Sequence, residues 1–124
     1  MCFAAPRMKL RIRANTIRLR LTQGEVQRLA SGERIEERTT FEGGAVLAYA
    51  ISSSEIAAPR ASFAGGAVEV VVPRGAVGVW AASDRVGIEG GHGALSILVE
   101  KDFACLTPRV HEDDDAFPNP NATC

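Results

Sequence analysis

The residues best suited to chemistry gather near the C-terminus of the chain. Cys105, His111 and the acids 112–115 offer a thiolate, an imidazole and several carboxylates. These groups are the ligands that zinc and other transition metals take in proteins. The residue types therefore predict a metal site formed by Cys105, His111, Asp113 and Asp115, with zinc as the candidate cofactor.

The spacing of these residues also fits a simpler interpretation. The segment has no CxxC or HxxxH pair, and its acids lack the periodic oxygen ligands and the glycine of a calcium loop. A solvated acidic tail behind a buried cysteine at a strand end has the same composition. Thiol catalysis, with Cys105 as nucleophile and His92 or His111 as base, needs a contact in space that sequence does not show. A metal-dependent or thiol-dependent enzyme is therefore the alternative to a binding protein.

A further candidate is a cluster of cations near the start of the chain. Residues 8–13 and 17–21 each alternate polar and apolar residues, which predicts two strands of a hairpin. The cations would share the outer face of that hairpin and could bind phosphates or a carboxylate-rich partner. An ordinary solvated face, neutralised by Glu36, Glu37 or the acidic tail, shows the same pattern. The cations are Lys9, Arg11, Arg13, Arg18 and Arg20.

Composition argues against nucleic acid and membrane as partners. Bases stack on aromatic side chains, and the five cations have no aromatic residue among them. The 124-residue chain has a net charge of -1, which gives the whole molecule no strong field. No apolar run approaches the roughly 18 residues of a membrane span.

The elements that must position these residues occur twice. Residues 17–38 can be laid over residues 68–89 without a gap, and each copy then gives a strand, a short helix and a strand. Thr22 followed by Glu25 predicts a capping box, Gly32 predicts the end of the first helix, and Pro73 replaces the cap in the second. The coinciding apolar residues are Ile17 with Val68, Leu19 with Val70, Leu21 with Val72, Val26 with Val77, Leu29 with Trp80, Ala30 with Ala81, and Ile35 with Val86.

Short connections and amphipathic strands predict an α+β fold: a curved, mainly antiparallel sheet or partial barrel built from two β-β-α-β-β halves, with one short helix each. A pseudo-twofold axis would relate the halves and offer a groove for a ligand. We expect Trp80 in the core and residues 90–93 in a flexible loop. The first hairpin should turn five apolar residues to the core: Leu10, Ile12, Ile17, Leu19 and Leu21.

The domain limits follow from the same patterns. Residues 1–7 are expected to be an extension, residues 8–104 a single domain with halves at about 8–61 and 62–104, and residues 105–124 an acidic tail containing prolines. The polar strand expected at 34–40 could pair with a second copy if its edge is open, which makes a homodimer a candidate assembly.

The chain resembles a group of small uncharacterised bacterial proteins in its segments MKLRIR and IRLRLTQGEV, and in its ending KDFACLTPR followed by acids and FPNPN. The resemblance covers nearly the whole chain from Met8. It implies a common single-domain fold and identifies no catalytic residues. The start MCFAAPR lacks the apolar region of a secretory signal, and the 3 cysteines form no CxxC pair. The sequence thus predicts a small cytoplasmic binding protein whose ligand or protein partner it does not identify.

Overall fold

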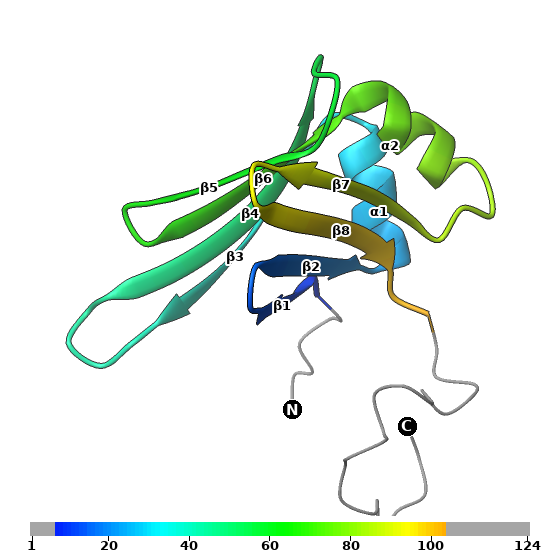
Figure 1. Cartoon of the computed structure of the whole chain (residues 1–124). Coiled ribbons are helices and arrows are strands. Elements are labelled where there is room, and N and C mark those ends of the chain that lie inside the picture. The colour runs from blue at the N-terminus through cyan, green and yellow to red at the C-terminus, as the bar shows by residue number, and fades with distance from the viewer. Residues whose placement is uncertain (1–6, 104–124) are drawn as a thin grey trace, which may run out of the picture.

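The computed structural model describes residues 7–103, which form two short helices and two sheets of four strands. Both helices lie at one end of the sheets, and two long hairpins, β3–β4 and β5–β6, project from the other (Figure 1). The elements are β1 (Lys9–Arg13), β2 (Thr16–Leu21), α1 (Gln23–Ala30), β3 (Ile35–Thr40), β4 (Val46–Ser54), β5 (Arg60–Ala64), β6 (Ala67–Pro73), α2 (Arg74–Ala81), β7 (Gly87–His92) and β8 (Leu95–Lys101).

Each sheet consists of two antiparallel hairpins joined by a parallel pair of strands. Sheet A has the order β1-β2-β8-β7 and sheet B the order β3-β4-β6-β5. The central pairs, β2 with β8 and β4 with β6, are parallel, while the flanking pairs are antiparallel. The predicted α+β class is confirmed, with most pairings antiparallel. The strands are divided between two open sheets, and neither a single sheet nor a barrel forms.

The predicted duplication appears in the strand registers. In the first hairpin Lys9 pairs with Arg20, and Arg60 and Val71, each 51 residues later, pair in the third hairpin. Each half gives one hairpin to each sheet, because its helix carries the chain from one sheet to the other. Neither sheet is therefore complete without both halves.

The two helices pack against each other, at the end of the sheets where both lie, through apolar residues that coincide in the gapless alignment. Val26 and Leu29 of α1 and Val77 and Trp80 of α2 are all buried, and α1 packs against α2. An eight-residue helix is marginal in isolation, so this packing is what holds both helices in place. The same core contains residues of both sheets: Met8, Ile17, Leu19, Leu21, Ile35, Ile51, Val68, Val70, Val72, Ile88, Ile97 and Val99.

The ends of the helices follow the sequence signals. The Thr22 hydroxyl accepts from the Glu25 N–H at 3.3 Å, and the Glu25 carboxylate accepts from the Thr22 N–H at 2.9 Å, so the capping box forms. Gly32 follows α1 with a φ of +97°, the left-handed conformation that glycine takes just past a helix end. Pro73 occupies the N-cap of α2, which has no side-chain cap.

One predicted equivalence between the halves is wrong. Val86 does not match Ile35, because Val86 is 54% exposed and Ile88 is buried. Ile35 pairs with Ile51 in sheet B as Ile88 pairs with Val99 in sheet A, so the connection after α2 is two residues longer. Side chains alternate between the two faces of a strand, so a shift of two residues leaves each side chain on the same face. The gapless alignment therefore still matched apolar residues with apolar residues.

Two local predictions for sheet A also fail. Ile12 is 59% exposed, and its counterpart in the third hairpin, Phe63, is 68% exposed. Both residues lie near hairpin tips, beyond the covered core. The predicted flexible loop begins too early, since β7 continues through His92. A Cβ at Gly90 would lie 2.6 Å from the ring of Pro59, so this strand glycine permits a close approach between segments.

Tyr49 links sheet B to the entry of β1, since its hydroxyl donates to the Met8 carbonyl at 2.9 Å. Burial raises the pKa of Tyr49 above the ordinary value of 10.0, and the charges of Glu37 and Glu25 raise it further. The folded state thus holds this proton more tightly than the unfolded chain. The corresponding stability is present below the ordinary pKa and is lost as pH rises through the folded pKa.

We therefore expect an ultraviolet titration of Tyr49, which is the chain's one tyrosine, to give a midpoint above 10.0 in the folded protein. Above pH 10, the free energy of unfolding should fall less steeply with pH in the Tyr49→Phe variant than in the unmodified protein, because the variant has no phenol to ionise. A midpoint at or below the ordinary value would contradict the assignment.

Candidate functional site

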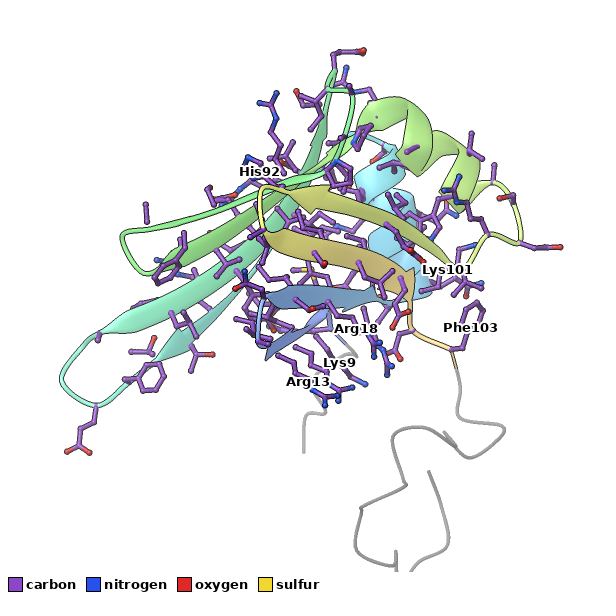
Figure 2. The ribbon with its side chains drawn as sticks, viewed as in Figure 1. Lys9, Arg13, Arg18, His92, Lys101 and Phe103 are labelled. Atoms are coloured by element: carbon purple, nitrogen blue, oxygen red, sulfur yellow. The ribbon has the colours of Figure 1, made fainter. Side chains whose placement is uncertain are left out.

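The five cations lie on the outer face of β1 and β2, opposite the buried side chains Leu19 and Leu21. Figure 2 shows Lys9, Arg13 and Arg18 close together on this side of sheet A. Alternation along each strand explains the arrangement, because every second side chain points away from the core. We call the surface formed by Lys9, Arg11, Arg13, Arg18 and Arg20 the basic face.

The strand register places like charges opposite one another on this face. Lys9 lies across from Arg20, and Arg11 lies across from Arg18. Like charges directly opposite each other on paired strands are destabilising. The pairing thus creates a positive field that carboxylates can relieve.

Two carboxylates at the end of sheet A supply part of this compensation. Glu100 of β8 lies beside Arg20 in the parallel register, and its Oε1 is 2.8 Å from Arg20 Nε and 3.4 Å from Arg18 Nε. Asp102 Oδ2 is 3.2 Å from Lys9 Nζ. Glu100 lies between two arginines and therefore shows how a carboxylate binds on the basic face.

From the sequence we predicted Glu36, Glu37 or the acidic tail as the counter-charges of the five cations, and Glu100 and Asp102 were missed. Glu36 pairs with Arg34 and Arg38 on sheet B, and Glu37 pairs with Arg7. The signal for the correct acids was their two-residue spacing at the end of the last strand, which puts both on one face. Recognising them also required the parallel pairing of β2 with β8, a contact between distant parts of the chain.

A hollow of about 360 Å³ opens on the basic face, lined by Arg11, Arg13, Ala14, Thr16 and Arg18. At its rim Ala14 has a φ of +48°, a left-handed conformation that is unusual for a residue with a Cβ. The next residue holds the turn: Asn15 Nδ2 donates to the Ala94 carbonyl at 3.1 Å, and the Asn15 carbonyl accepts from the Ser96 N–H at 2.8 Å. The wall of the hollow is thereby anchored to the β7–β8 turn.

The equivalent face of sheet B carries different chemistry. Arg34 donates a hydrogen bond to Glu69, which raises the pKa of Arg34. The same backbone arrangement thus forms without a cluster of cations, so the fold does not require one. The counterparts of Lys9, Arg11, Arg13, Arg18 and Arg20 are Arg60, Ser62, Ala64, Glu69 and Val71.

A second hollow, of about 450 Å³, lies where the start of α1, the end of α2 and the end of β8 meet. Its lining mixes apolar and polar side chains, among them Val26, Gln27 and Phe103. Lys101 also lines it, and its Nζ donates to the Ser83 carbonyl at 2.8 Å. Lys101 and Phe103 lie at the end of sheet A where the described chain stops (Figure 2).

The other predicted site residues are not brought together by the described structure. Cys105, His111, Asp113 and Asp115 lie outside residues 7–103. His92 is exposed, and its Nδ1 is 3.0 Å from the Ala61 carbonyl oxygen and 3.2 Å from the Ala61 nitrogen. Within the described range, no three His, Cys, Asp or Glu residues are grouped so as to hold a metal ion.

A family model described as a family of unknown function, DUF7009, matches residues 8–121. The chain belongs to the DUF7009 family. This confirms the resemblance to a group without an established activity, and the DUF7009 match contains both the basic face and the acidic segment 112–115.

Comparisons with curated proteins and with solved structures found no similar protein. Among the described residues of this DUF7009 member, neither helix has the length and apolar character needed to cross a membrane.

Proposed function

We propose that the protein is a binding module that holds an acidic polypeptide segment on its basic face. The observation that carries the proposal is Glu100, whose carboxylate lies within 3.4 Å of Arg18 Nε and 2.8 Å of Arg20 Nε. An arginine Nε–H is a donor suited to carboxylates, and the charge of both partners strengthens the hydrogen bond. An acidic ligand would extend this pattern toward Arg11 and Arg13.

The spacing of the cations favours an extended peptide. Lys9, Arg11 and Arg13 occupy every second position of β1, so they recur about every 6.6 Å along the strand. Alternate side chains of an extended ligand recur at the same interval. A segment rich in Asp or Glu can therefore place successive carboxylates against successive cations.

The place of β1 in sheet A supports the same ligand. β1 is an edge strand with mostly exposed residues, and an open edge can accept an extended segment through backbone hydrogen bonds. A single-stranded nucleic acid would need aromatic side chains for base stacking. The outward side chains of β1 and β2 are Lys9, Arg11, Arg13, Thr16, Arg18 and Arg20, and they provide no such platform.

The cytoplasm of a bacterial cell is the compartment that we propose for this binding. The support is the resemblance to bacterial proteins and the cysteine pattern, which has an odd count and no CxxC pair. The metal-dependent or thiol-dependent enzyme remains the second candidate. It rests on the residue types of Cys105, His111 and the neighbouring acids.

Binding of a fluorescent hexaglutamate peptide, followed by anisotropy, tests the proposal. At an ionic strength of about 0.01 M the Debye length is about 30 Å, so charge contacts are weakly screened. We expect saturable binding that weakens as salt is added. The double variant Arg11→Ser/Arg13→Ala, which installs the residues found at the equivalent positions of β5, should bind about tenfold more weakly, since each exposed ion pair contributes up to about 1 kcal/mol.

A matched control removes the same number of cations from sheet B. Arg38→Ala/Arg60→Ala changes the net charge equally but leaves the basic face intact. We expect this variant to bind hexaglutamate within about twofold of the unmodified protein, because its substitutions lie outside the contact. Equal losses for both double variants would mean that net charge, and not the basic face, governs binding.

A further inference from the structure

The described chain ends beside the basic face. The Asp102 N–H donates to the Leu21 carbonyl at 2.9 Å, and the Asp102 carboxylate reaches Lys9 Nζ at 3.2 Å. The last described residues of the chain therefore lie next to the first cation of the face. Any acidic group a short distance further along the chain begins close to a complementary surface.

The sequence supplies such a group. Glu112, Asp113, Asp114 and Asp115 are four consecutive acids, and Glu112 lies ten positions after Asp102 in the sequence. At about 3.3 Å per residue, that connection can span up to about 33 Å. The distance along β1 from Lys9 to Arg13 is about 13 Å, so the acids can reach every cation of the face.

The acids and the basic face also belong to one family unit. The DUF7009 match begins at residue 8, directly before β1, and continues to residue 121, beyond the last of the four acids. The match thus joins the two oppositely charged segments from opposite ends of the chain.

We propose that residues 112–115 dock on the basic face of the same chain and compete there with external acidic ligands. The competition rests on the proposed function, whereas the docking does not. A tethered segment acts at an effective concentration of the order of millimolar, so even weak docking suppresses the binding of a dilute ligand. The acidic segment would act as a built-in competitor that a stronger acidic partner displaces.

The competition is tested with a neutralised tail. Asp113→Asn/Asp114→Asn/Asp115→Asn should bind hexaglutamate about tenfold more tightly than the unmodified protein at low salt. The matched control, Glu33→Gln/Glu42→Gln/Asp84→Asn, removes three exposed acids elsewhere and should change affinity by less than about twofold. The competition is overturned if the two triple variants bind equally tightly.

The docking is tested without any external ligand. Ala116→Cys in a chain whose three native cysteines are replaced by serine accepts a spin label beside Asp115. We expect the label to broaden backbone amide resonances of residues 9–20 much more than those of 60–71, the equivalent hairpin, and expect salt or the tail triple variant to abolish the difference. Dilution into unlabelled protein distinguishes contact within one chain from contact between chains.

The two sets of results separate the two proposals. Equal broadening of both hairpins, or none, overturns the docking even if hexaglutamate still binds the basic face. Selective broadening of residues 9–20 in a protein that binds no hexaglutamate supports the docking and contradicts the proposed function.

Discussion

Replacing Trp80 by alanine should lower the free energy of unfolding by about 3–5 kcal/mol, the usual cost of removing a buried tryptophan side chain. Trp80 is fully buried in α2, and its Nε1–H donates to the Val86 carbonyl at 3.0 Å. The substitution would open a cavity where α2 meets the core and would leave the turn after α2 without this hydrogen bond. Urea unfolding followed by circular dichroism measures the loss, because the chain's one tryptophan is removed.

Two positions provide controls for Trp80. Leu29 is its counterpart in α1 and is equally buried, so Leu29→Ala should cost about 2–5 kcal/mol. Val79 is adjacent on α2 but 57% exposed, so Val79→Ala should change stability by no more than about 0.5 kcal/mol. If Trp80→Ala costs no more than Val79→Ala, the paired helices do not form the centre of the core.

Replacing Glu25 by alanine should cost about 2–4 kcal/mol, since hydrogen bonds to a charged acceptor contribute about 1.5–3 kcal/mol each and are not additive. Glu25 is the buried charged residue of the described chain, at 6% exposure. One carboxylate oxygen accepts from the Met8 N–H at 2.9 Å, and the other accepts from the N–H and the hydroxyl of Thr22 at 2.9 and 3.1 Å. The side chain therefore secures both the start of α1 and the residue before β1.

Thr22→Ala is the comparison for Glu25, because it removes only the hydroxyl half of the capping box. Losing an N-cap side chain typically costs about 1 kcal/mol. Urea unfolding should therefore show a clearly larger loss for Glu25→Ala. Equal losses would mean that the contact with Met8 contributes nothing beyond the cap. Hydrogen exchange of the Met8 amide, expected to accelerate only in Glu25→Ala, reports on that contact separately.

Local sequence signals predicted the elements but not their distribution between sheets. Alternation of apolar residues identifies the strands, and Thr22, Glu25 and Gly32 identify the limits of α1, because these signals act over a few residues. The parallel pairing of β2 with β8 joins segments about 80 residues apart, as Arg20 with Glu100 illustrates. No local pattern encodes that contact, so the exchange of hairpins between the halves could not be predicted.

The candidate site, like the fold, could be predicted from local patterns but not from contacts between distant parts of the chain. Period-two alternation is enough to put Arg18 and Arg20 on one face. The identity of their counter-charge, Glu100, depends on the same long-range pairing and was missed. The exposure of Ile12 has a related cause, since alternation predicts which face a side chain takes but not how far the opposite layer extends.

We propose that the basic face, and not its counterpart on sheet B, receives acidic polypeptide. The most direct measurement is a titration of isotope-labelled protein with hexaglutamate, observed through backbone and arginine side-chain resonances. We expect the shifts to concentrate on β1, β2 and the Nε–H groups of Arg11 and Arg13, while residues 60–71 are unaffected. Shifts spread equally over the two hairpins, or confined to residues 60–71, would contradict it.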